Sequence, residues 1–98
     1  MARALAVSRV SVAPDSESEY LRVAGELARL SEGRGRHLWV FRAPDRRGVF
    51  LECSESRTVE SHRTVVEPRD DERRLEVRLR ELASYAPDAW DLWEEVAL

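Results

Sequence analysis

The sequence predicts a single α+β domain, in which a four-stranded antiparallel sheet carries helices on one face. Three observations lead to this prediction. The chain has 98 residues, of which 43% are hydrophobic and 36% charged, which suits one globular domain over residues 1–98. Short β-branched runs alternate with helical stripes in the order strand, helix, strand, strand, helix, helix, strand. The segment from Pro44 to Gly48 has the composition of a turn between the two central strands.

Residues 4–12 are predicted to form the first strand, because valines recur at intervals and the run ends before Pro14. A helix is predicted over residues 15–32. Acidic residues lie at its expected N-terminus, where they suit the positive end of the helix dipole. Gly33 and Gly35 end the helix. Its apolar stripe has the i, i+3, i+4, i+7 spacing of a core-facing helix and consists of Tyr20, Val23, Ala24, Leu27 and Ala28.

Residues 36–43 are predicted to form the second strand, with apolar side chains on both of its faces, and residues 49–54 to form the returning strand. The turn between them is expected to place Phe41 opposite Phe50. In this register one face of the strand pair carries Leu38, Val40, Leu51 and Cys53. The other face is an aromatic surface with embedded polar groups, made of His37, Trp39, Phe41, Phe50 and Glu52.

The pattern loosens in the second half of the chain. Residues 57–66 are predicted as a short helix that ends before Pro68, with an irregular strand as the alternative. The next helix begins at the acidic residues 70–72 and ends before Pro87. Its apolar stripe is Leu75, Leu79, Leu82 and Ala83. Residues 91–97 are predicted as the closing strand, with a final helix as the alternative.

Together these elements predict a ferredoxin-like sandwich. Helices can cover only one face of such a sheet, whereas the second strand is apolar on both faces. The uncovered face therefore has to meet another surface, and a second copy of the sheet is the simplest partner. We expect a homodimer in which two sheets pack face to face and enclose the aromatic surface.

Composition narrows the possible functions. A formal net charge of −3 does not favour binding to nucleic acid. All sixteen basic residues are arginine, and asparagine, glutamine and isoleucine are absent; codon bias or heat adaptation explains this, with an arginine-lined anion site as the alternative. Cys53 is the only cysteine, which suits a reducing compartment. Because no apolar run approaches the length of a membrane span, we expect a cytoplasmic protein.

The strand pair His-Leu-Trp-Val-Phe (37–41) and Val-Phe-Leu-Glu-Cys (49–53) is followed by Ser54-Glu55-Ser56 and by Val59-Glu60-Ser61-His62. Together with the strand and helix before it, this pattern resembles the dimeric α/β-barrel superfamily, in particular its antibiotic-biosynthesis-monooxygenase-like domains. In such domains a short helix ends near a histidine, and His62 falls at a comparable place. The oxygenases of this type use an asparagine together with a tryptophan. This chain has no asparagine, so that catalytic assignment does not carry over.

Three side chains are candidates for proton transfer: His37, Glu52 and His62. His37 and Glu52 are expected to lie near one another on the aromatic surface, with a polar interface pair as the alternative; a packed or solvent-facing helix residue is the alternative for His62. The candidates for ligand binding are Arg9, Trp39, Phe41 and Phe50, with interface packing and, for Arg9, an exposed strand position as alternatives. No metal-ligand spacing, phosphate loop or hydrolase motif is present, so no metal and no cofactor are expected.

These observations support two hypotheses equally. The first is a monooxygenase-like protein that binds a small apolar or aromatic molecule in a pocket between sheet and helices, the substrate itself supplying electrons to oxygen. The second is a non-catalytic binding or structural homodimer, whose aromatic sheet face is only the subunit interface.

Overall fold

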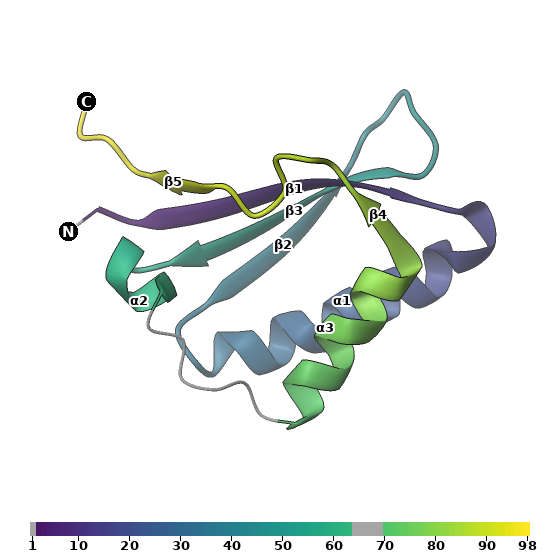
Figure 1. Ribbon diagram of the computed structural model, residues 1–98, viewed down its shortest axis with the longest axis horizontal. Coiled ribbons are helices and arrows are strands. Elements are labelled where there is room, and N and C mark those ends of the chain that lie inside the picture. Colours follow the sequence, from purple (N-terminus) through teal and green to yellow (C-terminus); the bar gives the residue numbers. More distant parts are fainter. Residues whose placement is uncertain (1, 64–69) are drawn as a thin grey trace.

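The computed structural model describes residues 2–63 and 70–98 and contains one antiparallel sheet packed against helices (Figure 1). The strands are β1 (Ala4–Val12), β2 (His37–Arg42), β3 (Val49–Ser56), β4 (Ala83–Tyr85) and β5 (Leu92–Glu94). The helices are α1 (Glu17–Glu32), α2 (Val59–Arg63) and α3 (Asp70–Leu82), and a 3-10 turn at Pro14–Ser16 precedes α1. Figure 1 shows α1 and α3 together on one side of the sheet, which confirms the predicted α+β fold.

The sheet is open and has four positions, one of which is shared by two strands. The order across it is β2–β3–β1–β4, and β5 pairs with β1 beside β4. The second half of β1 pairs with β4 and the first half with β5. The closing strand predicted at residues 91–97 is therefore shorter than expected, since β5 covers only Leu92–Glu94. The sequence did not predict β4, because its first residue, Ala83, was assigned to the apolar stripe of the helix that precedes it.

The core lies between the sheet and α1. The predicted stripe of α1 is buried, except for the half-buried Ala28, and α3 contributes Leu79 with Leu75 beside it. Residues 59–63 of the predicted 57–66 segment are helical, as favoured by the sequence; residues 64–69, with Pro68, lie outside the described residues. The helix predicted to begin at residues 70–72 begins there, at Asp70.

The pairing of β2 with β3 differs by one residue from the predicted register. Phe41 lies opposite Leu51, not opposite Phe50. Because side chains alternate between the faces of a strand, this one-residue difference exchanges the two faces of β3. Phe50 and Glu52 face the helices, and the outer face, defined as the side of the sheet opposite the helices, carries Leu51 and Cys53. The predicted aromatic surface containing Phe50 and Glu52 is therefore wrong.

Gly48 closes the connection between β2 and β3 in a conformation that other residues adopt at a cost. Its φ is +72°, and its carbonyl oxygen accepts a hydrogen bond of 2.7 Å from the Val12 N–H. A Cβ atom at Gly48 would lie 2.5 Å from the Val12 carbonyl oxygen, so this position excludes any side chain unless the backbone shifts.

We expect Gly48→Ala to lower the free energy of unfolding by about 3 kcal/mol, because it adds a backbone clash to the cost of a positive φ. Gly35→Ala is the matched control, since Gly35 has a φ of +76° but open space around its missing Cβ. We expect a loss of about 1–2 kcal/mol there. Urea unfolding measures both variants, and equal losses would contradict the steric explanation.

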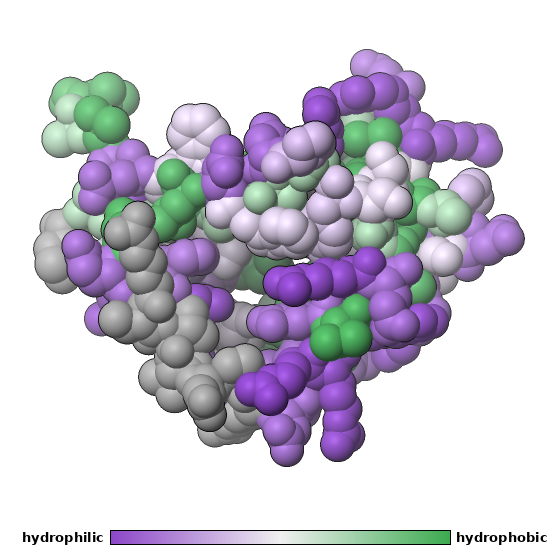
Figure 2. Space-filling model, viewed as in Figure 1, coloured by the Kyte–Doolittle hydropathy of each residue, from purple (hydrophilic) through white to green (hydrophobic). Residues whose placement is uncertain are grey.

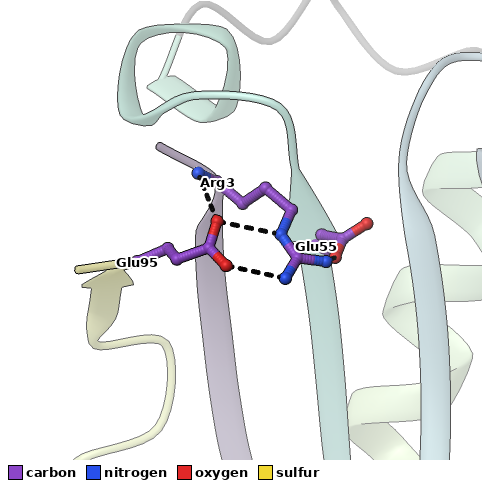
Figure 3. Close-up of polar contacts among 3 residues, drawn as sticks. All are labelled: Arg3, Glu55 and Glu95. Carbon is purple, nitrogen blue, oxygen red and sulfur yellow. Dashed lines mark hydrogen bonds and ion pairs between the residues drawn. The ribbon is translucent and has the colours of Figure 1, made fainter. Parts of the chain in front are cut away.

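Arg3 joins both neighbouring strands at the end of β1 (Figure 3). Its Nε and Nη2 atoms donate to the carboxylate of Glu95 at 3.1 and 2.8 Å, and its Nη1 atom donates to Glu55 at 2.9 Å. The Glu95 N–H also donates to the Arg3 carbonyl oxygen. These contacts hold the segment after β5 alongside β1, so the fourth position of the sheet is occupied at both of its ends.

Candidate functional site

A cavity of about 320 Å³ lies between the sheet and α3, on the helix side. Figure 2 shows the molecule hollowed at this place, with hydrophilic side chains of α3 along one rim. Residues from every layer line the cavity, among them Ser8, Glu52, His62, Arg80, Tyr85 and Trp90. The cavity opens beside the middle of β1, between the part that pairs with β4 and the part that pairs with β5. Among the described residues no strand pairs with this side of β1 there, and the loop of residues 86–91 runs alongside it instead.

Glu52 is the buried carboxyl group of this cavity. It lies in the middle of β3, opposite Ser8 of β1 and Val40 of β2, and its side chain is 8% exposed. The one-residue difference in register places it here, since in the predicted register it would face away from the helices. A carboxylate this deeply buried requires hydrogen-bond donors.

Two tyrosine hydroxyls supply these donors. Tyr20 of α1, which is fully buried, donates to Oε2 of Glu52 at 2.7 Å. Tyr85 of β4 donates across both oxygens, at 2.9 Å to Oε2 and 3.1 Å to Oε1. Among the described residues, Oε1 accepts only the longer branch of the Tyr85 bond. Oε1 is therefore the oxygen with capacity to accept a proton from a ligand.

The electrostatics of this cluster favour a base. Burial raises the pKa of Glu52, while the hydrogen bonds from the two tyrosines and the charge of Arg80 oppose that rise. Burial, reinforced by the adjacent carboxylate, raises the pKa of Tyr20 and of Tyr85, so both phenols stay protonated and keep donating. A carboxyl group whose pKa is raised toward the working pH is a better proton acceptor than an ordinary surface glutamate.

Trp90 forms the outer part of the cavity wall. Its ring stacks on that of Tyr85, with the two centroids 4.8 Å apart. The Arg80 guanidinium lies 5.1 Å from the centroid of the Trp90 ring and makes a cation–π contact with it. Its backbone N–H donates to Oγ of Ser8 at 3.1 Å. Its φ is +71°, which is unfavourable for a bulky residue.

His62 reaches the same cavity from α2. Thr58 and Ser61 bond reciprocally at the start of this helix, with each backbone N–H donating to the other's hydroxyl, and this capping arrangement fixes where α2 begins. The Nδ1 atom of His62 lies 3.1 Å from Oγ of the buried Ser56. The His62 carbonyl oxygen accepts a bond of 3.1 Å from Arg36. The imidazole is therefore held in one orientation at the cavity wall.

The structure divides the predicted site residues between three places. Glu52 and His62 line the cavity. Phe50 lies in the core, its ring 5.3 Å from that of Tyr20. The remaining four lie on the outer face of the sheet: Arg9, His37, Trp39 and Phe41. The predicted pairing of His37 with Glu52 is wrong because the two side chains project to opposite faces; His37 stacks on Trp39 instead, at 5.9 Å.

Sequence reasoning missed the partners of Glu52. Tyr20 was expected to pack in the core, which it does, but its hydroxyl also serves the carboxylate. Tyr85 follows the helical stripe of α3 and carried no signal of its own. Trp90, in the loop before β5, also lines the cavity and belongs to no motif of the sequence. One signal was available: a glutamate between apolar neighbours in a strand needs buried donors, and tyrosines are the residues that place a hydroxyl in a core.

We expect the stability of the fold to depend on pH through Glu52. Because burial raises the pKa of Glu52 in the folded chain, its stabilising contribution is complete below its unfolded pKa of about 4.3 and is lost as the pH rises through the folded pKa. Glu52→Gln cannot ionise. The stability of the wild type should therefore fall relative to that of the variant as the pH rises from about 4 to 8. Urea unfolding across this range measures the difference, and a difference independent of pH would contradict the burial of this charge.

Among the described residues, no group of three or more His, Cys, Asp or Glu side chains is arranged to hold a metal ion. None of the helices in the described part of the chain combines the length and the apolar composition needed to cross a membrane.

No protein-family model matches the sequence, and no curated protein matches it significantly. Solved structures do match. A variant of SnoaB, a cofactor-independent oxygenase from Streptomyces nogalater, superposes with a TM-score of 0.72 at 14% identity, over 97% of this chain and 92% of that chain. A candidate antibiotic biosynthesis monooxygenase from Chloroflexus aurantiacus gives 0.71 at 15% identity, over 100% and 94%. A conserved protein of unknown function from Bacteroides thetaiotaomicron gives 0.69 at 20% identity, over 96% and 95%.

The chain thus has an α+β fold with helices on one face of an antiparallel sheet. Within that class it has the fold of the antibiotic-biosynthesis-monooxygenase-like proteins, as the sequence resemblance implied.

Proposed function

We propose that this chain is a monooxygenase-like protein that binds a small aromatic molecule with an ionisable hydroxyl in the cavity, and that Glu52 accepts the proton of that hydroxyl. The observation that carries this proposal is the buried Glu52 carboxylate at the cavity wall, where Oε2 accepts from two tyrosines and Oε1 only from the longer branch of the Tyr85 bond. The likeness to SnoaB, itself a cofactor-independent oxygenase, supports oxygen as the second substrate.

The chemistry begins with a phenol or enol whose O–H donates to Oε1 of Glu52. Transfer of that proton leaves an electron-rich substrate anion, and the nearby charge of Arg80 stabilises the anion as it stabilises ionised Glu52. The anion supplies the electrons to dioxygen. The ring C–H carbon para to the hydroxyl becomes a carbonyl by gaining one oxygen atom. The second oxygen atom leaves as water, with the hydrogen of that carbon and the proton that Glu52 had accepted.

The size of the cavity limits the ligand. A volume of about 320 Å³ is near the lower end for small-molecule sites and corresponds to about ten water molecules. The wall is mixed: Leu27, Leu38 and Leu79 contribute apolar surface, and Ser31 and Ser54 contribute hydroxyls. This favours compact one- or two-ring phenols over larger polycyclic molecules.

A thermal-shift panel tests the proposal, because a ligand that binds only the folded state raises the melting temperature. The panel pairs one- and two-ring phenols and quinols with their O-methyl ethers, which cannot donate a proton to Glu52. We expect some phenols to raise the melting temperature and their methyl ethers to raise it less. The absence of a shift across the panel would contradict the proposal.

We further propose that a second copy of the chain covers the outer face of the sheet. Large apolar side chains are exposed there: Trp39 is 45% exposed, Phe41 56% and Trp93 60%. They lie on β2 and β5 at the two sides of one continuous face, with Leu51 between them. A face of this kind is typical of a self-association surface. Because the cavity lies on the opposite side of the sheet, this dimer is compatible both with catalysis and with the alternative of a non-catalytic homodimer.

A further inference from the structure

A series of contacts runs from the surface of the molecule to the buried carboxyl group. Arg80 of α3 lies over the ring of Trp90, and Trp90 stacks on Tyr85 of β4. Tyr85 donates to Glu52 of β3, which also accepts a hydrogen bond from Tyr20 of α1. Five residues from different parts of the chain thus form one connected array. Trp90 is the only one of the five that lies in a loop and not in a helix or strand.

The backbone of Trp90 is held in a conformation that it would not adopt by itself. A φ of +71° costs a bulky residue free energy, and such outliers persist only where the surroundings determine them. Three contacts supply that determination: the bond of its N–H to Ser8, the stack on Tyr85 and the guanidinium of Arg80. The stack and the guanidinium contact also fix where the indole ring lies.

Tyr85 depends on that ring for its own placement. It lies in a strand of only three residues, followed at once by the loop of residues 86–91, and its side chain is half-buried. Its hydroxyl bridges both oxygens of Glu52, an arrangement that a small rotation of the phenol would break. Tyr20, in contrast, lies in the middle of the core on the long helix α1, is fully buried and needs no such support.

We infer that Trp90 is a positioning residue, which acts through Tyr85 to hold the hydroxyl bridge on the Glu52 carboxyl group. The inference rests on the proposed function for its consequence, since a displaced Tyr85 would leave Oε1 without its donor and Oε2 with Tyr20 alone, and so change the base. It concerns the free protein, so it can be tested without any ligand. The other titratable or charged groups that line the same cavity are Arg36 and His62, and from α3 Glu76 and Arg80.

The experiment is a titration of the Glu52 carboxyl carbon by ¹³C NMR, with the signal assigned by its loss in Glu52→Gln. Tyr85→Phe removes one donor to the carboxylate and should raise the midpoint of the titration. We expect the same rise when Tyr85→Phe is added to Trp90→Phe, which keeps a stacked ring. We expect little or no rise when it is added to Trp90→Gly, because the hydroxyl is no longer held in place.

This design cancels the direct effect of Trp90→Gly on solvation, since each comparison is made within one background at residue 90. Glycine also tolerates a positive φ, so the variant loses the ring without adding strain. If Trp90→Gly does not fold, Ser8→Ala replaces it: loss of the acceptor for the Trp90 N–H should reduce the rise caused by Tyr85→Phe.

An equal rise in the wild-type and Trp90→Gly backgrounds, or in the Ser8→Ala background where that variant stands in, would overturn the inference. Tyr20→Phe is the matched control, because Tyr20 also donates to Glu52 but does not contact Trp90. Its effect on the midpoint should be the same in every background. A failed ligand panel would leave these titrations unaffected, so failure of the proposed function and failure of this inference are distinguishable.

Discussion

Glu52→Gln is expected to lower the turnover of a phenolic ligand by about 10²–10⁴-fold, the range over which a general base contributes. Glutamine has nearly the same shape and can still accept hydrogen bonds from the tyrosines, but it cannot take a proton. Affinity for the ligand should change much less than turnover. Initial rates of oxygen consumption and calorimetric binding constants separate the two quantities.

The control for this experiment is Glu26→Gln, which removes a carboxylate of α1 that pairs with Arg22 and does not line the cavity. It should retain the wild-type rate. A Glu52→Gln rate within a few fold of the wild type would show that Glu52 is not the base. His62, the other titratable predicted side chain at the cavity wall, would then be the residue to replace next.

Trp39→Glu is expected to convert a dimer into a monomer. In the proposed dimer the exposed ring of Trp39 is buried against the partner. A carboxylate in its place loses that apolar contact and has to be desolvated, which is strongly unfavourable. Val77→Glu is the matched control, because Val77 of α3 is 55% exposed but lies in the helix layer, away from the outer face. That variant should keep the oligomeric state of the wild type.

Sedimentation velocity at micromolar concentration measures the change. A wild-type chain that sediments as a monomer would contradict the proposed dimer, as would a Trp39→Glu variant that stays dimeric.

The sequence was sufficient for the order of elements but not for the register of the central hairpin. Periodicity identified α1 because one stripe, from Tyr20 to Leu27, is apolar while the opposite face is charged. In β2 and β3 both alternations are apolar, so hydrophobicity does not distinguish the two possible registers. The connection between the strands decides between them, and its geometry depends on Gly48 against Val12, a contact between residues far apart in the sequence.

The candidate site followed from the register. Glu52 and His62 were identified by residue type, and both line the cavity, yet the sequence placed Glu52 on the wrong side of the sheet. Its tyrosine partners come from α1 and β4, elements that no local pattern brings together. The sequence also did not predict that two short strands, β4 and β5, share the fourth position of the sheet and leave the cavity open beside Trp90. Helix and strand patterns compete in this C-terminal segment.

The central claim is that a ligand binds beside Glu52, on the helix side of the sheet. The most direct measurement is a ligand titration, with the best phenol of the panel, that follows the Glu52 carboxyl carbon and the Trp39 indole by NMR. A saturable change at Glu52, with Trp39 unchanged, is the predicted result. A saturable change at Trp39, with Glu52 unchanged, would place the ligand on the outer face and contradict the claim.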